Sequence, residues 1–158
     1  MSIKKIVVSQ YQGIVNSTAN QSRGISTPTE GWVRTVRKAL NMSGAQLAKR
    51  MKVTRARVQK IETAELDSAV TLKTMQCTAQ AMGCRFVYAI VPEQEIENLI
   101  SEQARKKAEA LVHTTNTHMA LEAQTLPNEK VNYEIERLTQ EILNKMPMDF
   151  WDEIKGDK

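Results

Sequence analysis

The run TRARVQKIE, residues 54–62, contains residue types that can hydrogen-bond to the edges of DNA bases. Arg can reach guanine with two hydrogen bonds, Gln can pair in the same way with adenine, and an Ala methyl group can contact thymine. Val58 and Ile61 are three residues apart, so they share the buried face of a helix and leave the opposite face free. That face would read bases with four side chains: Arg55, Ala56, Gln59 and Lys60.

Apolar residues at helical spacing predict four helices within residues 31–83 that would position this run. GWVRTVRKAL forms the first, and SGAQLAKRM forms the second, with Ser43 as its N-terminal cap. After a tight turn, Thr54 caps the third, and TLKTMQCTAQAM forms a fourth that stops at Gly83. Two helices joined by a tight turn, with a basic outer face, are typical of a helix-turn-helix. An ordinary four-helix domain is the alternative, and it would usually mix both charge signs on a solvated face.

Phosphate contacts would fix this unit on the DNA backbone without reading its sequence. Helix N-termini offer free N–H groups to phosphates. The residues assigned to this role are Ser43, Gly44 and Arg57, together with Thr71 and Lys73 at the start of the fourth helix.

The run MSGAQLAKRMKVTRARVQKIETAE resembles the Xre/Cro-type helix-turn-helix of phage and plasmid repressors. The resemblance implies an ion pair between Arg37 on the first helix and Glu62 on the third. One position departs from the family pattern, because Gly44 stands where Gln is common. A backbone contact from Gly44 to a phosphate would still be possible there.

A wider resemblance covers nearly the whole chain. The segments GWVRTVRKALNMSGAQLAKRM, AVTLKTMQCTAQAMGCRFVYAIVP, HMALEAQ and FWDE are similar to the family called mobile mystery protein A. Its members are Xre-type proteins that are usually encoded beside a Fic-domain protein. This resemblance implies the antitoxin or regulator half of a two-gene module, with a Fic-type toxin as a possible partner.

Charge divides the chain into two parts. Residues 1–90 hold 14 Lys and Arg against 4 Asp and Glu, whereas residues 91–158 hold 8 against 14. A basic part is typical of a DNA footprint, since Lys and Arg release the counterions condensed on phosphates. The acidic part would be repelled by DNA and would face another protein or a partner subunit.

No pattern in the chain predicts an enzyme, a cofactor or a metal centre. Cys77 and Cys84 are spaced unlike zinc ligands and are expected to be reduced, buried thiols. No apolar run approaches the length of a membrane span. The apolar run near the N-terminus is too short for a signal peptide. The expected location is the bacterial cytoplasm, on the DNA.

Residues 84–92, CRFVYAIVP, are rich in aromatic and β-branched residues and predict a single β-strand. A lone strand needs a partner, and the same strand of a second copy would give a two-stranded ribbon across a two-fold axis. Pairing with the N-terminal IVV segment is the alternative. The expected dimer contacts are Phe86, Val87, Tyr88, Ala89 and Ile90.

The remaining segments are an N-terminal arm, 1–30, and an acidic helical region, 93–158. The first half of the arm could be a helix or a strand, and the stretch of Ser, Thr, Asn, Gln, Gly and Pro from Asn16 to Thr29 predicts a loop. The arm would either enter the minor groove or be a disordered leader. Near the C-terminus, Phe150 and Trp151 would either tuck onto the body or anchor a partner.

These observations predict a mainly α protein: an arm 1–30, a helix-turn-helix domain 31–83, a dimerisation strand 84–92 and helices over 93–158. The expected function is a homodimeric, sequence-specific repressor that binds a palindromic double-stranded operator and serves as antitoxin to a Fic-type partner. Two alternatives stay open. The acidic region could neutralise a toxin by protein binding alone, or the chain could be a phage-type repressor without a toxin partner.

Overall fold

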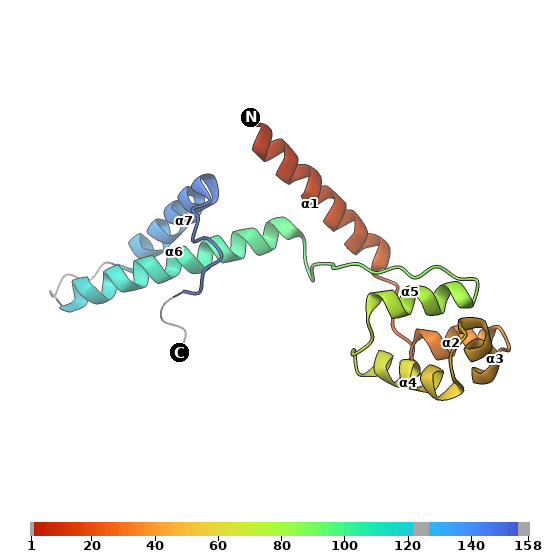
Figure 1. Cartoon of the computed structure of the whole chain (residues 1–158). Helices are drawn as coiled ribbons and strands as arrows, with labels where there is room; N and C mark the ends of the chain where they lie inside the picture. The colour runs from red at the N-terminus through yellow and green to blue at the C-terminus, as the bar shows by residue number, and fades with distance from the viewer. Residues whose placement is uncertain (1, 122–126, 155–158) are drawn as a thin grey trace. The chain divides into compact units, whose positions relative to one another are not determined.

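The computed structural model describes residues 2–121 and 127–154, which divide into two compact units (Figure 1). Unit 2 comprises residues 21–90, and unit 1 comprises residues 1–20 and 91–158. The described residues form seven α-helices. Searched over that part of the chain, no helix is long and apolar enough to cross a membrane.

Unit 2 holds four short helices around one apolar core: α2 (Trp32–Ala39), α3 (Gly44–Met51), α4 (Arg55–Leu66) and α5 (Leu72–Ala81). Each helix contributes at least one side chain to the core, because their apolar residues recur every three or four positions. The buried members are Val33, Leu47, Ala48, Val58, Ile61, Met75 and Met82.

Hydrogen bonds close both ends of α3 and the start of α4. The Ser43 hydroxyl accepts from the Gln46 N–H while the Gln46 side chain accepts from the Ser43 N–H, which is a capping box. At the far end Lys52 adopts a left-handed conformation, and the Val53 N–H donates to the Ala48 carbonyl. The Thr54 hydroxyl then accepts from the Arg57 N–H and starts α4.

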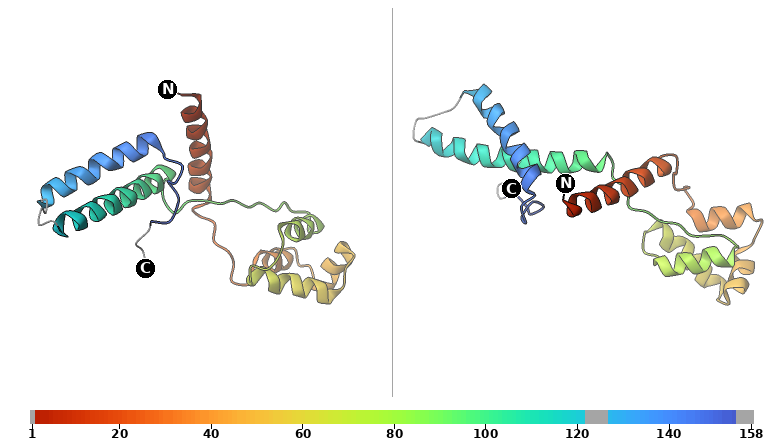
Figure 2. Two further views of the ribbon diagram at one scale, coloured as in Figure 1. Left: turned by 60° about the vertical axis from the view of Figure 1, so that its left-hand side comes forward. Right: turned by 90° about the horizontal axis from the view of Figure 1, so that it is seen from above.

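Unit 1 contains α1 (Ile3–Ser22), α6 (Ile96–Leu121) and α7 (Asn128–Lys145). Helices α6 and α7 lie side by side (Figure 2). Their contact is built on small residues, because Ala104 and Ala108 of α6 are fully buried. After α7 the chain turns back, and Phe150 is buried with only 2% of its surface exposed.

The N-terminal segment is helical as far as Ser22, although its polar second half predicts a loop. Hydrogen bonds from within the segment support this conformation, such as that from the Thr18 hydroxyl to the Ile14 carbonyl. The polar residues therefore stay compatible with a helix because their hydroxyls and amides find partners there.

The predicted β-strand at 84–92 is wrong, because no β-strand occurs among residues 2–121 and 127–154. A strand requires a second backbone beside it, and the proposed intrachain partner, the IVV segment, lies inside α1. Phe86 instead packs against the core of unit 2. Its ring stacks on Tyr88, with 6.1 Å between ring centroids. In this segment Phe86 thus packs on a helical domain, whereas the β-branched Val87 and Ile90 are exposed.

Candidate nucleic-acid interface

Helix α4 presents the four predicted base-reading residues to solvent. Val58 and Ile61 are buried in the core, so the far side of the helix is free. Arg55 lies in the first turn of the helix, directly after the Thr54 cap. The exposed residues of the first two turns are Arg55, Ala56, Arg57, Gln59 and Lys60.

Glu62 holds α4 against α2 through two arginines. Its carboxylate accepts from Arg37 Nε at 2.7 Å and from Arg34 Nε at 3.0 Å. A further guanidinium N–H of Arg37 donates to the Met42 carbonyl, which ties the same cluster to the segment before α3. The Glu62 side chain is only 4% exposed, so the ion pair with Arg37 is a buried structural contact.

Burial alone would raise the pKa of the Glu62 carboxyl, because it disfavours the charged form. The hydrogen bonds from Arg37 and Arg34, with the positive charges of both groups, outweigh that effect and hold this pKa below its ordinary value. Glu62 therefore stays ionised around neutral pH.

A second carboxylate of α4, Glu65, caps the N-terminus of α2. Glu65 accepts from the Trp32 N–H at 2.6 Å and from the Val33 N–H at 3.0 Å. No side chain of α2 itself makes this cap. An acidic side chain at a helix N-terminus satisfies free N–H groups and complements the helix dipole. The sequence reasoning missed this contact, although Glu65 follows Glu62 by three residues and so shares its face.

Gly31 makes room for the Glu65 carboxylate. Its φ angle is +81°, and a Cβ atom at this position would lie 2.8 Å from Glu65 Oε2. Both facts favour glycine, since other residues rarely adopt this backbone and have an atom where the carboxylate lies. The pair Glu62 and Glu65, with Gly31, is called the carboxylate clamp below.

The clamp determines the charge of the exposed face. Glu62 and Glu65 are the two acidic residues of α4, and both are turned inward to α2. The outward face of its first two turns thus carries Arg55, Arg57 and Lys60 with no carboxylate among them. Such a face is complementary to phosphates and base acceptors, and it is fixed relative to α2 and α3.

The predicted phosphate contacts are all at the surface or half-buried, at three helix N-termini. Ser43 and Gly44 begin α3, Arg57 lies in the first turn of α4, and Thr71 and Lys73 begin α5. A Cβ atom on Gly44 would meet nothing within 4 Å, so the backbone there is open. The Thr71 hydroxyl donates to the Thr74 hydroxyl and accepts from its N–H, so its proton is already engaged within the helix.

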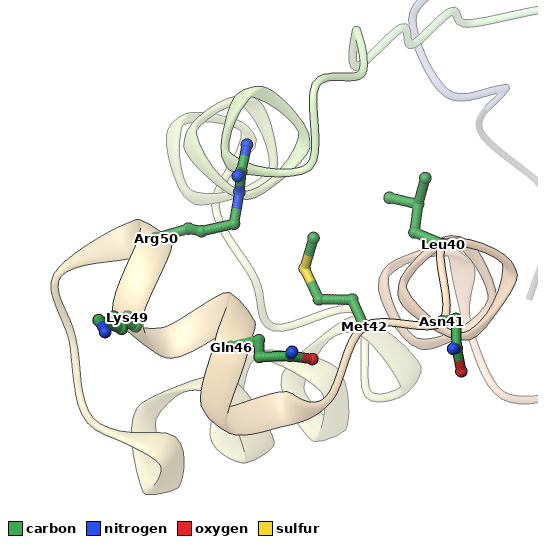
Figure 3. Close-up of a pocket in the computed structure, with 6 residues that line it drawn as sticks. All are labelled: Leu40, Asn41, Met42, Gln46, Lys49 and Arg50. Atoms are coloured by element: carbon green, nitrogen blue, oxygen red, sulfur yellow. The ribbon is translucent and has the colours of Figure 1, made fainter.

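A shallow pocket of about 340 Å³ lies beside α3, between the end of α2 and α5 (Figure 3). Arg50 reaches across toward α5 and donates from Nε to the Ala81 carbonyl at 2.5 Å. A cation at a helix C-terminus is favourable because it faces the negative end of the dipole. This bond ties α3 to α5 and makes the pocket part of the scaffold. The pocket is lined by Leu40, Asn41, Met42, Gln46, Lys49 and Arg50.

Comparison with protein families gives a match over the same region: residues 33–88 match the family described as Helix-turn-helix. Residues 33–88 form an Xre-type helix-turn-helix domain. Comparisons with curated proteins and with solved structures gave no match. The domain contains α2–α5 and supports DNA binding by a transcription regulator.

Of the predicted dimer contacts, Phe86 is part of the helix-turn-helix domain and the others lie at its surface. The helix-turn-helix domain extends to residue 88 and includes Phe86, which packs on its core. Val87, Tyr88, Ala89 and Ile90 are exposed and form no strand. Cys77 and Cys84, expected to be buried, are exposed free thiols.

Proposed function

We propose that this chain is a sequence-specific DNA-binding repressor in the cytoplasm, a binding protein rather than an enzyme, which reads a palindromic operator as a homodimer. Helix α4 would be the recognition helix, with Arg55, Ala56, Gln59 and Lys60 at the base edges. Ser43, Gly44, Arg57, Thr71 and Lys73 would contact phosphates.

The observation that carries this proposal is the carboxylate clamp. It turns both acids of α4 away from solvent and holds the helix rigidly on α2. Sequence readout needs side chains fixed in register with the base pairs, because a good bidentate contact discriminates by about 1–3 kcal/mol only when its geometry is met. A basic face that is both exposed and held in place satisfies this requirement.

The test is a matched pair of arginine substitutions in the first turn of α4. Arg55→Ala should cost about 1–3 kcal/mol on the cognate operator and relax specificity at one base pair. Arg57→Ala should weaken binding about equally on all sequences and reduce the salt dependence. Gel-shift titrations at two salt concentrations, on upstream DNA and on scrambled DNA, measure both effects. Equal weakening by Arg55→Ala on every sequence would remove it from base reading.

A second candidate function is protein binding by unit 1, supported by how the C-terminal tail is held. Gln103 donates to the Phe150 carbonyl at 2.9 Å, and Lys107 pairs with Asp149 at 3.1 Å. Phe150 is thereby buried, while the next residue, Trp151, stays 63% exposed. Phe150 thus tucks onto the body, as one of the two predicted alternatives has it, and Trp151 stays free for the other. An exposed Trp on an anchored segment suits a protein contact.

The resemblance to mobile mystery protein A makes a Fic-type toxin the first partner to test, with this chain as its antitoxin. Trp151→Ala should weaken co-purification with the product of the neighbouring gene and leave operator binding unchanged. Tyr133→Ala is the control, since Tyr133 is an exposed aromatic of α7 in the same unit. Equal co-purification by wild type and Trp151→Ala would exclude Trp151 as the contact, whereas no co-purification by the wild type would favour a repressor without a toxin partner.

A further inference from the structure

Helix α1 exposes many large apolar side chains. It is 20 residues long, and none of its residues is buried. Most of the stability of a helix in a protein comes from packing of its apolar face rather than from helix propensity, so such a helix normally needs a packing partner. Large apolar side chains within residues 3–14 are 41–81% exposed, and they are Ile3, Ile6, Val7, Val8, Tyr11 and Ile14.

Four of these side chains form one seam along α1. With about 100° of rotation per residue, Ile3, Val7, Tyr11 and Ile14 fall within about a quarter of the helix circumference. The seam covers most of the first three turns. Apolar residues at such spacing are typical of a helix face that packs against another helix.

The opposite face of α1 is already engaged within unit 1. Asn16 Oδ1 accepts from the Ile96 N–H at 3.0 Å, and Asn16 Nδ2 donates to Glu97 at 2.8 Å. Asn16 thus caps the N-terminus of α6. Because Asn16 lies about half a turn around α1 from Val7, this contact holds the polar face against α6 and turns the seam away from it.

We infer that the seam of α1 binds the same seam of a second copy of this chain, with the two helices antiparallel. The spacing between successive seam residues is four, four and three, which reads nearly the same from either end. An antiparallel pair therefore sets Ile3 opposite Ile14 and Val7 opposite Tyr11, so each apolar residue meets an apolar residue. A two-fold interface requires a surface that is complementary to itself in this way.

The charges of α1 favour the same arrangement. Lys4 and Lys5 are its charged residues, both at one end, and no acidic residue accompanies them. A parallel pair would bring the four lysines together. In the antiparallel pair, equivalent lysines lie about 11 to 14 Å apart along the axis, at or beyond the screening length of about 10 Å at moderate salt.

This interface rests on the proposed function only in its purpose, since a dimer would supply two recognition helices for a palindromic operator. It replaces the predicted ribbon as the means of self-association. Its physical basis lies entirely within α1 and requires no DNA.

The experiment measures the mass of the full chain in solution by light scattering, without DNA. The wild type should have about twice the 17.8 kDa of one chain. Val7→Asp and Tyr11→Lys should each be monomeric at the same concentration, because each homodimer would bury two unpaired charges. Mixing the two variants should restore the dimer. In the mixed antiparallel pair, the new Asp at position 7 of one chain faces the new Lys at position 11 of the other, and the second such contact keeps the native Val7 and Tyr11. Ser9→Asp and Asn20→Lys, away from the seam, are the matched controls and should remain dimeric.

Circular dichroism verifies that each variant keeps its helix content. A monomeric wild type, or a Val7→Asp variant that stays dimeric, would overturn the inference. Failure of the mixture to re-form a dimer would overturn the antiparallel pairing. Operator binding is measured separately: a wild-type dimer without specific DNA binding would overturn the proposed function alone, and a wild-type dimer that binds its operator but persists in Val7→Asp would overturn this interface alone.

Discussion

The two units use charged residues in different ways. In the helix-turn-helix domain, Glu62 and Glu65 are turned inward and connect separate helices. In unit 1 most ion pairs are exposed and several run along one helix, as those of Arg137 with Glu134 and Glu141 do on α7, although Lys107 reaches Asp149 in the tail. Pairs of the first kind determine how helices sit against one another, whereas exposed pairs of the second kind contribute little to stability.

The difference in ion pairing corresponds to different requirements of the two units. The domain must hold α4 in register with DNA, and a carboxylate between two helices gives a directional constraint that apolar packing alone lacks. Unit 1 derives its order from close packing of Ala104 and Ala108 and from the anchored tail. Its exposed charges leave a surface that other proteins can approach.

The strongest test of this comparison is removal of Glu62. Glu62→Ala should destabilise the helix-turn-helix domain by about 3–5 kcal/mol, because the charge of Arg37 is left buried without a partner. Chemical unfolding of the full chain measures this loss, followed by Trp32 fluorescence in a Trp151→Phe background. Glu134→Ala in unit 1 is the control, followed by Trp151 fluorescence in a Trp32→Phe background, and should leave the unfolding of its own unit nearly unchanged. A Glu62 variant as stable as the Glu134 variant would show that the two kinds of ion pair do not differ.

A smaller loss is expected from closing the space at Gly31. Gly31→Ala should cost about 1–3 kcal/mol, since it strains a positive φ angle and brings a Cβ atom against the Glu65 carboxylate. Gly24→Ala is its matched control in the same unit, because a Cβ atom there meets nothing within 4 Å. Thermal melts of the two variants measure the difference. Equal melting temperatures would contradict the role of the clamp.

Acid should distinguish the two units further. The folded-state pKa of Glu62 is lowered below the ordinary 4.5, so its stabilising contribution is complete above that pH and is lost as pH falls through the folded value. Glu134 also has a lowered pKa, from its hydrogen bond with Arg137, but it is exposed and therefore screened by salt. In 1 M salt the acid sensitivity of the helix-turn-helix domain should persist while that of unit 1 falls. Glu62→Gln should reduce the loss of stability that the helix-turn-helix domain shows as pH falls. An unchanged pH dependence of stability would assign this loss to other groups.

The sequence predicted the DNA-binding domain well because local signals agree there. Ser43 and Thr54 cap the helices that their positions predict, and the structure contains the Arg37–Glu62 ion pair that the family resemblance implies. Glu65 was missed because its partners are backbone N–H groups about 30 residues away. Such groups are present in almost every residue type, so the sequence does not indicate them.

The failure at residues 84–92 has a different origin. Aromatic and β-branched residues favour any half-buried surface, and their composition alone does not state whether a strand or a helical domain provides it. Phe86 finds that surface on the core of the domain. For α1, the polar residues after Asn16 suggested a loop because tertiary partners such as the N-terminus of α6 cannot be read locally.

The smallest expected effect concerns Gly44, where the chain departs from the Xre pattern. Gly44→Gln should stabilise the domain by about 0.5 kcal/mol, because glycine is a poor helix residue and open space surrounds its Cβ position. Gly13→Gln on α1 is matched in both respects and should stabilise unit 1. Only Gly44→Gln should also tighten operator binding in gel-shift titrations, because its new amide would lie at the N-terminus of α3 beside a phosphate. Tighter binding by both variants would trace the gain to helix stability, and tighter binding by neither would place the start of α3 away from the DNA.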